Sequence, residues 1–108
     1  MTAQALWITT KGELVVLDTL GLDALQEAVG GWVQAIDLSP NLCLWVNEEG
    51  KMHNLPHNLK GQVIWDSFFG EGTDYIVGNI VLTGGTDNDG ETLALTAEDI
   101  ETLSSVLG

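Results

Sequence analysis

The chain contains no arginine and only three lysines, whereas sixteen of its residues are aspartate or glutamate. Its formal net charge at pH 7 is −13. Nucleic-acid-binding proteins neutralise backbone phosphates with lysine and arginine, so a chain with this charge repels DNA and RNA. The absence of arginine also removes the bidentate fork that recognises phosphate and carboxylate groups. We therefore expect no direct binding to nucleic acid.

Long hydrophobic runs are missing as well. The longest segment without a charged residue spans positions 75–86, whereas a membrane-spanning helix needs roughly 20 apolar residues. The first residues, MTAQALWITTK, begin uncharged and lack a long apolar core, so we expect no signal peptide. The single cysteine, Cys43, cannot build a disulfide framework, and without a basic neighbour it is expected to be a buried, inert thiol. A cytoplasmic location is the resulting expectation.

The composition is that of one folded domain. Hydrophobic residues make up 44% of the 108 positions, and a chain of this length buries roughly two-thirds of its unfolded surface. No repeat or linker interrupts the sequence, so we expect residues 1–108 to form a single domain. The charge is uneven, because the nine acidic residues in positions 61–108 are accompanied by no lysine. Such a field would speed the approach of a basic partner protein, although an acid-rich proteome would produce the same composition.

Hydrophobic periodicity predicts three hairpins, each followed by a helix. Strands are expected at 5–10 and 13–18, at 32–38 and 42–46, and at 75–83 and 92–95. Helices are expected at 22–29, from an Asn58 N-cap through 69, and after a capping box at Thr96–Asp99. In the second helix Leu59 and Val63, with either Ile64 or Phe68, should face inward. The order ββαββαββα predicts an α+β fold, with a mostly antiparallel sheet built from hairpins and the helices packed on one face.

The densest polar stretch is WVNEEGKMHNLPHN, residues 45–58. Asn47 and Gly50 fit the first and fourth positions of a type I turn, where Gly50 can adopt a positive φ. His53 and His57 have the i, i+4 spacing of two metal ligands on a helix, but Pro56 prevents one helix from spanning them. A solvated turn is therefore favoured over a metal site.

The segment GTDNDGET, residues 85–92, has the composition of a calcium-binding loop without its spacing. An EF-hand that placed Asp89 fifth would need an acidic residue or asparagine at position 85 and glutamate at position 96. Those positions hold Gly85 and Thr96. A polar hairpin loop is favoured, and a loose surface calcium site is left as the alternative.

Catalytic patterns are also missing from the sequence. None of the serines lies in a GxSxG context, and no nucleophile, base and orienting group occur together. The four tryptophans are expected in the core, with one or two exposed at a sheet face as anchors for a partner. We therefore expect a function other than catalysis, without catalytic residues, cofactor or metal.

The passage LWVNEEGKMHNLPHN resembles the hallmark segment of a family known only as domain of unknown function 3846. The resemblance extends from LDALQEAVGGWVQAIDL, residues 22–38, to DYIVGNIVLTG, residues 74–84. It implies a phage or mobile-element accessory protein, because members of that family are typically found in bacteriophages, plasmids and their bacterial hosts. Residues 59–62, LKGQ, depart from the small and basic residues usual at that place. No activity is implied, because the family has none assigned.

Two functional hypotheses follow from these observations. The first is a binding protein that engages a host protein, for example a defence or restriction component, through its acidic half, which includes Glu98, Asp99 and Glu101. The alternative is a small-ligand binder such as a sponge for a signalling nucleotide, and a small enzyme ranks third. The candidate binding residues of the two polar segments are Asn47, Glu48, Glu49, Lys51, His53, His57, Asn58, Asp87, Asp89 and Glu91.

Overall fold

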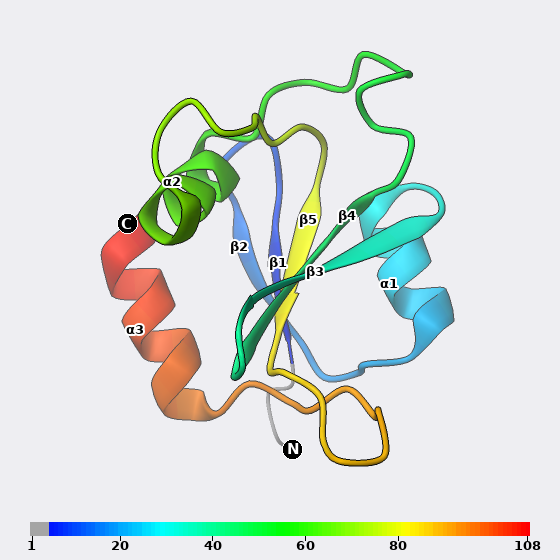
Figure 1. Cartoon of the computed structure of the whole chain (residues 1–108), viewed down its shortest axis with the longest axis vertical. Coiled ribbons are helices and arrows are strands. Elements are labelled where there is room, and N and C mark those ends of the chain that lie inside the picture. Colours follow the sequence, from blue (N-terminus) through cyan, green and yellow to red (C-terminus); the bar gives the residue numbers. More distant parts are fainter. Residues whose placement is uncertain (1–4) are drawn as a thin grey trace.

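Five strands form one antiparallel sheet in the computed structural model, which describes residues 5–108 (Figure 1). The strands are β1 (Ala5–Ile8), β2 (Leu14–Leu17), β3 (Val33–Ser39), β4 (Leu42–Asn47) and β5 (Ile80–Thr83). Their order across the sheet is β2-β1-β5-β4-β3, so β5 lies between the two hairpins and pairs with both. The predicted α+β class and antiparallel sheet are confirmed. Residues 1–4 lie outside the described residues. They belong to the N-terminal segment in which the sequence predicts no signal peptide.

Three helices accompany the sheet, and capping residues set the starts of two of them. The helices are α1 (Leu22–Val29), α2 (Leu59–Phe69) and α3 (Ala97–Leu107). The predicted N-cap of α2 is confirmed, because the Asn58 side chain accepts a hydrogen bond from the Gly61 N–H. The predicted capping box of α3 is also confirmed, since the side chains of Thr96 and Asp99 each accept from the other's backbone N–H. No helix within residues 5–108 is long and apolar enough to cross a membrane.

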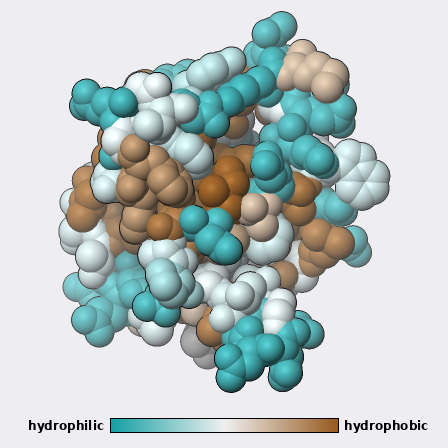
Figure 2. Space-filling model, viewed as in Figure 1, coloured by the Kyte–Doolittle hydropathy of each residue, from teal (hydrophilic) through white to brown (hydrophobic). Residues whose placement is uncertain are grey.

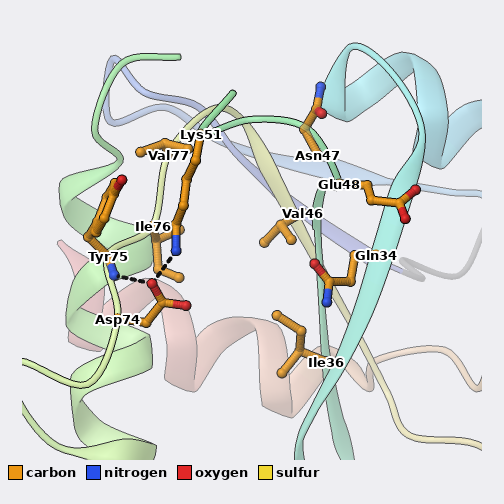
Figure 3. Close-up of a pocket in the computed structure, with 10 residues that line it drawn as sticks. All are labelled: Gln34, Ile36, Val46, Asn47, Glu48, Lys51, Asp74, Tyr75, Ile76 and Val77. Carbon is orange, nitrogen blue, oxygen red and sulfur yellow. Dashed lines mark hydrogen bonds and ion pairs between the residues drawn. The ribbon is translucent and has the colours of Figure 1, made fainter. Parts of the chain in front are cut away.

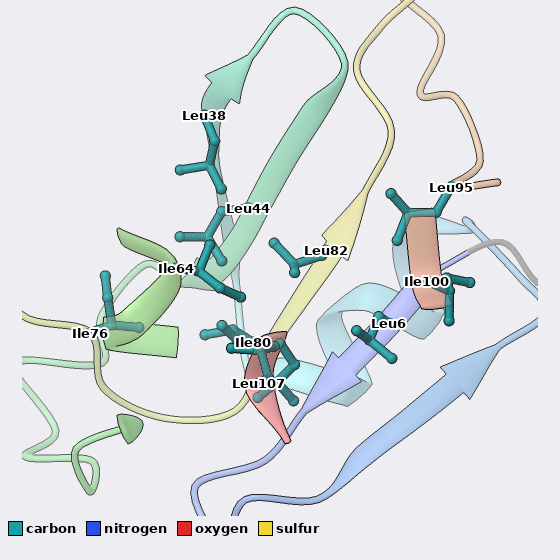
Figure 4. Close-up of a cluster of buried hydrophobic side chains, with 11 residues drawn as sticks. Leu6, Leu38, Leu44, Ile64, Ile76, Ile80, Leu82, Leu95, Ile100 and Leu107 are labelled. Carbon is teal, nitrogen blue, oxygen red and sulfur yellow. The ribbon is translucent and has the colours of Figure 1, made fainter. Parts of the chain in front are cut away.

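The helices lie on both faces of the sheet. α2 and α3 cover the larger core, and α1 packs on the opposite face (Figure 1). The larger core contains Leu6, Ile8, Leu38, Leu44, Ile64, Ile76, Ile80, Leu82, Leu95, Ile100 and Leu107 (Figure 4). The smaller core contains Ala5, Leu25, Val29 and Val81. α1 thus differs from the expectation of helices on one face, because all four residues of β5 are buried and both faces need cover.

The third predicted hairpin forms only in part. The strand expected at 75–83 shortens to β5, because Gly78 adopts a φ of 77° and its N–H donates to the Pro56 carbonyl over 2.8 Å. Residues 92–95 form no strand, although Thr92 bridges Thr86 and the Gly84 N–H donates to the Leu93 carbonyl. The segment before β5 is therefore a loop whose backbone hydrogen bonds go to residues outside the sheet.

The predicted inward face of α2 is confirmed only in part. Ile64, one of the two expected alternatives, is buried together with Gly61, whereas Leu59 and Val63 are 71% and 51% exposed. A Cβ atom added to Gly61 would lie 2.8 Å from the Cδ1 of Ile80, so the missing side chain lets α2 approach the sheet closely. The apolar residues of this helix surround it on several sides, and periodicity alone did not select the inward face.

A tight backbone contact joins the β3–β4 turn to the loop after β5. A Cβ atom on Gly85 would lie 2.0 Å from the Pro40 carbonyl oxygen. We therefore expect Gly85→Ala to lower the free energy of unfolding by about 1–3 kcal/mol, as overpacking does, measured by urea denaturation.

A matched substitution controls for the loss of glycine itself. The Cβ of Gly21→Ala would have the Thr19 hydroxyl as its nearest contact, at 3.5 Å. This variant should change the free energy of unfolding by less than about 1 kcal/mol, as replacement of an N-cap glycine does. Equal stabilities of the two variants would contradict a close approach at Gly85.

Candidate functional site

The polar segment after β4 begins with the predicted turn. The Gly50 N–H donates to the Asn47 carbonyl over 3.1 Å, and the Asn47 Oδ1 accepts from the Glu49 N–H over 2.8 Å. The φ of Gly50 is not positive, contrary to what the turn allowed. Within the described chain, Asn54 is the one residue other than glycine with a positive φ, at 52°. Gly50 is needed for space, because its Cβ would lie 3.0 Å from the Cγ2 of Val77.

Asn58 joins three parts of the structure through one buried side chain. Its Nδ2 donates to the carbonyls of Ile8 and Gly78 over 3.0 and 2.9 Å, and its Oδ1 accepts from the Gly61 N–H over 2.9 Å. Its backbone N–H donates to the Ile76 carbonyl over 2.8 Å. Since Asn58 is 0% exposed, it positions the surrounding loops and offers no surface to a partner.

Gln62 is a second amide that holds the loop before β5. Its Oε1 accepts from the Ile76 N–H over 2.9 Å and lies 2.8 Å from the His57 Nε2. Its Nε2 donates to the Asp66 carboxylate and to the Asp74 carbonyl. Gln62 was not among the residues predicted from the sequence, although its i, i+4 spacing from Asn58 places both amides on one side of α2. His57 is thus partnered by α2.

A small cleft of about 110 Å³ opens between the start of the β3–β4 hairpin and the loop that leads to β5 (Figure 3). Three of the sequence-selected residues, Asn47, Glu48 and Lys51, share this cleft. Its lining consists of Gln34, Ile36, Val46, Asn47, Glu48, Lys51, Asp74, Tyr75, Ile76 and Val77. The selected residues Glu49, His53 and His57 are not part of the lining. Apolar side chains of β3 and β4 face Ile76 across the cleft, with polar groups around them.

Lys51 connects the two segments that form one wall of the cleft. Its Nζ forms an ion pair with the Asp74 Oδ1 and lies 4.4 Å from the centre of the Tyr75 ring. The hydrogen bond from Lys51 lowers the pKa of the Asp74 carboxyl from its ordinary value. Lys51 is the one cation in the cleft lining, and its charge is already balanced by Asp74. The cleft therefore has little to offer a phosphate group.

The second group of selected residues lies at the opposite end of the domain. The loop at 85–92 is beside the β3–β4 turn, while residues 48–58 leave the other end of β4 (Figure 1). Hydrophilic side chains gather over this loop at the lower edge of Figure 2. The Asp87 Oδ1 accepts from the N–H groups of Asp89 and Glu91 over 2.8 and 3.0 Å. Asp87 thus shapes the loop.

The exposed carboxylates of this end extend into α3. Asp99 caps that helix, whereas Glu98 and Glu101 face solvent and take no part in the capping box. We call Asp89, Glu91, Glu98 and Glu101 the C-terminal carboxylates, because all four are exposed. Within residues 5–108, no three His, Cys, Asp or Glu side chains are arranged to hold a metal ion.

Cys43 is buried, whereas three of the tryptophans are half-buried and Trp32 is exposed. Cys43 is buried as predicted, and burial raises the pKa of its thiol to about 11, so it is protonated at neutral pH. Trp7 and Trp45 donate their indole N–H groups to the Ala28 carbonyl and the Thr83 hydroxyl. Trp32, at the start of β3, is 66% exposed. It is the tryptophan available to a partner.

Replacing Asn58 tests its central position. Asn58→Ala leaves the carbonyls of Ile8 and Gly78 and the N–H of Gly61 without this partner. Each buried polar group that loses its hydrogen bond costs about 1–3 kcal/mol. We therefore expect the free energy of unfolding to fall by at least about 3 kcal/mol in urea denaturation. Asn88→Ala, at an exposed position, should change it by less than about 0.5 kcal/mol.

Replacing Lys51 tests the ion pair through its dependence on pH. Asp74 has a depressed pKa in the folded state, so the pair stabilises the fold above the unfolded pKa, and this contribution is lost as pH falls through the folded pKa. Lys51→Met should raise the pKa of Asp74 in an NMR titration. Because both side chains are partly exposed, at 45% and 38%, the loss of stability at pH 7 should stay below about 1 kcal/mol.

The matched variant for this titration is Lys11→Met, which removes the same charge at another exposed position. It should leave the Asp74 pKa in place. An Asp74 pKa that is the same in the wild type and in Lys51→Met would show that the ion pair does not form in solution.

Comparison with known proteins places the chain in a family. A search of curated proteins and a search of solved structures each gave no match. A family model described as a domain of unknown function, DUF3846, matches residues 1–108. The resemblance seen in the polar segment and the strand before Gly84 thus extends over the whole chain, which belongs to the DUF3846 family.

Proposed function

We propose that this chain is a small, acidic, non-enzymatic binding protein that engages a basic segment of a partner protein. The observation that carries the proposal is the unbalanced charge of its surface. Of the sixteen acidic residues, Asp74 is the one that forms an ion pair within residues 5–108. Lys60 donates to the Gly12 carbonyl over 2.8 Å and neutralises no carboxylate. The negative field of the domain is therefore free to act on a partner.

The C-terminal carboxylates supply the part of this negative field that nearby cations neutralise least. No lysine occurs in residues 61–108, and the carboxylates of Asp87 and Asp99 accept hydrogen bonds from backbone N–H groups. Unpaired surface charges raise association rates with an oppositely charged partner and make binding sensitive to salt. A basic protein segment is the kind of partner whose binding would be fast and sensitive to salt.

The small-ligand alternative has less support from the geometry. The cleft beside the polar segment measures about 110 Å³, whereas pockets for drug-sized ligands usually measure about 300–1,000 Å³. Two hollows elsewhere reach about 350 and 430 Å³, but their linings contain glutamate and no cation. The one lysine of the cleft is paired with Asp74. A signalling nucleotide would have to bind there without a free cation for its phosphates, and the chain has no arginine to supply one.

The proposal extends to the biological setting. The resemblance of the polar segment to a family of phages and plasmids supports a mobile-element accessory protein that works in the host cytoplasm. A host protein, for example a defence or restriction component, is then the proposed partner.

Affinity capture from a bacterial lysate at low and high salt tests the acidic surface. The test variant replaces the C-terminal carboxylates by Asp89→Asn, Glu91→Gln, Glu98→Gln and Glu101→Gln. We expect the captured partner to dissociate steeply as salt rises, and the variant to bind it at least about tenfold more weakly, or about 1.4 kcal/mol.

A control variant removes the same number of charges elsewhere on the surface. It carries Asp18→Asn, Asp23→Asn, Glu27→Gln and Glu71→Gln, all at exposed positions. This variant should retain most of the affinity. Capture that is insensitive to salt, or that is weakened equally by both variants, would contradict binding through the C-terminal carboxylates.

A further inference from the structure

The outer side of β3 is a free sheet edge. β3 is the last strand of the sheet, and within residues 5–108 its strand partner is β4. The Trp32 carbonyl accepts from the Glu48 N–H over 2.8 Å and so fixes the phase of the ladder with β4. Hydrogen-bonding groups alternate in direction along an antiparallel strand. The N–H and C=O groups of Val33, Ala35 and Asp37 therefore face away from β4.

Three features surround this edge. The exposed Trp32 stands at its start. Gln34 and Ile36 point from β3 into the cleft on one face of the sheet (Figure 3). At its far end the β3–β4 turn contacts Gly85 through Pro40, beside the acidic loop. The free edge thus connects the exposed tryptophan with the carboxylate-rich end of the domain.

We propose that β3 accepts an extended segment of a basic protein as a sixth strand. This inference rests on the proposed function and names the place and the conformation of the bound segment. Strand addition satisfies the outward groups of Val33, Ala35 and Asp37 with main-chain hydrogen bonds. An exposed tryptophan next to the added strand provides the kind of anchor that dominates many interfaces.

The two faces of the sheet define the sequence of the bound segment. Side chains directly across an antiparallel pair lie on the same face. The residue opposite Ile36 therefore enters the cleft, whose walls include Val46 and Ile76, and an apolar side chain fits there. The residue opposite Asp37 lies on the other face beside an exposed carboxylate. Lysine or arginine suits that position, so the segment alternates apolar and basic residues.

A second copy of the chain suits this edge poorly. Antiparallel pairing of two β3 strands would bring two Asp37 carboxylates to neighbouring positions, and like charges across strands are destabilising. Each copy also carries a net charge of −13. The other sheet edge, β2, has four residues against seven in β3 and has no exposed tryptophan beside it. Charge and length together select a basic segment at β3.

A defined peptide tests the proposal directly. The probe is an acetylated and amidated Lys-Val-Lys-Val-Lys-Val-Lys peptide, added to the ¹⁵N-labelled protein. We expect saturable binding below about 1 mM, equivalent to about −4.1 kcal/mol, with the amide signals of Val33, Ala35 and Asp37 shifted and protected from hydrogen exchange. The same peptide with every backbone amide N-methylated keeps its charges but cannot donate, and should bind at least about tenfold more weakly.

Two substitutions on β3 separate pairing from charge. Ala35→Pro removes an outward N–H, and proline is tolerated on the free side of an edge strand. Asp37→Lys reverses one charge and leaves the backbone intact, so it serves even if the proline variant fails to fold. Both should weaken peptide binding at least about tenfold, whereas Asp18→Lys, at an exposed position after β2, should weaken it less than about threefold.

The outcomes distinguish this inference from the proposed function. Shifts at the β3 amides, lost in both β3 variants, support strand addition. Shifts confined to the acidic loop and α3, or equal binding of the N-methylated peptide, would overturn strand addition while leaving an acidic binding protein intact. Absence of binding at about 1 mM peptide, or −4.1 kcal/mol, would also overturn it. Salt-insensitive capture in the lysate experiment would instead reject the acidic surface.

Discussion

The side-chain amide of Asn58 connects the end of β1, the first turn of α2 and the loop that precedes β5. A buried amide of this kind must find partners for both its donors and its acceptor, because each unpaired group costs free energy. Those requirements place Gly78 and Ile76 beside the helix. β5 can then enter the sheet between β1 and β4, and the wall of the cleft follows from the same contacts.

Local chemistry was enough to predict the first two hairpins and the helix starts. The N-cap of α2 and the capping box of α3 are each specified by residues within four positions of one another. The position of β5 between the hairpins, and α1 on the second face, depend on burial between distant segments. The inward face of α2 was predicted only in part: Ile64 is buried as expected, but Leu59 and Val63 are exposed. Gly61 faces Ile80 instead, from a position that hydrophobic periodicity does not mark. The sequence shows which residues are apolar, but it does not show which of them contact one another in the folded chain.

The candidate site was predictable in part for a related reason. A polar side chain in a loop either forms hydrogen bonds to the backbone or remains exposed and free for a partner. The sequence alone does not distinguish these two cases. Asn58 and Asp87 hold backbone N–H groups, whereas Glu48 and Asp89 remain exposed. The cleft also recruits Gln34 and Tyr75, which are distant along the chain from the polar segment. Only the fold brings these residues together.

The acidic composition that leads us to expect no binding to nucleic acid also affects the free edge of β3. An uncharged edge strand would pair readily with another copy of itself, which is a common route to aggregation. Asp37 and the net charge of −13 oppose that pairing, yet they favour an approaching strand that carries lysine or arginine. A negative edge thus discriminates between partners through repulsion as well as attraction. Selectivity of this kind needs no dedicated pocket in a domain with so few cations. The exposed backbone of the edge would supply the hydrogen bonds, and the surrounding carboxylates would favour basic strands over acidic ones.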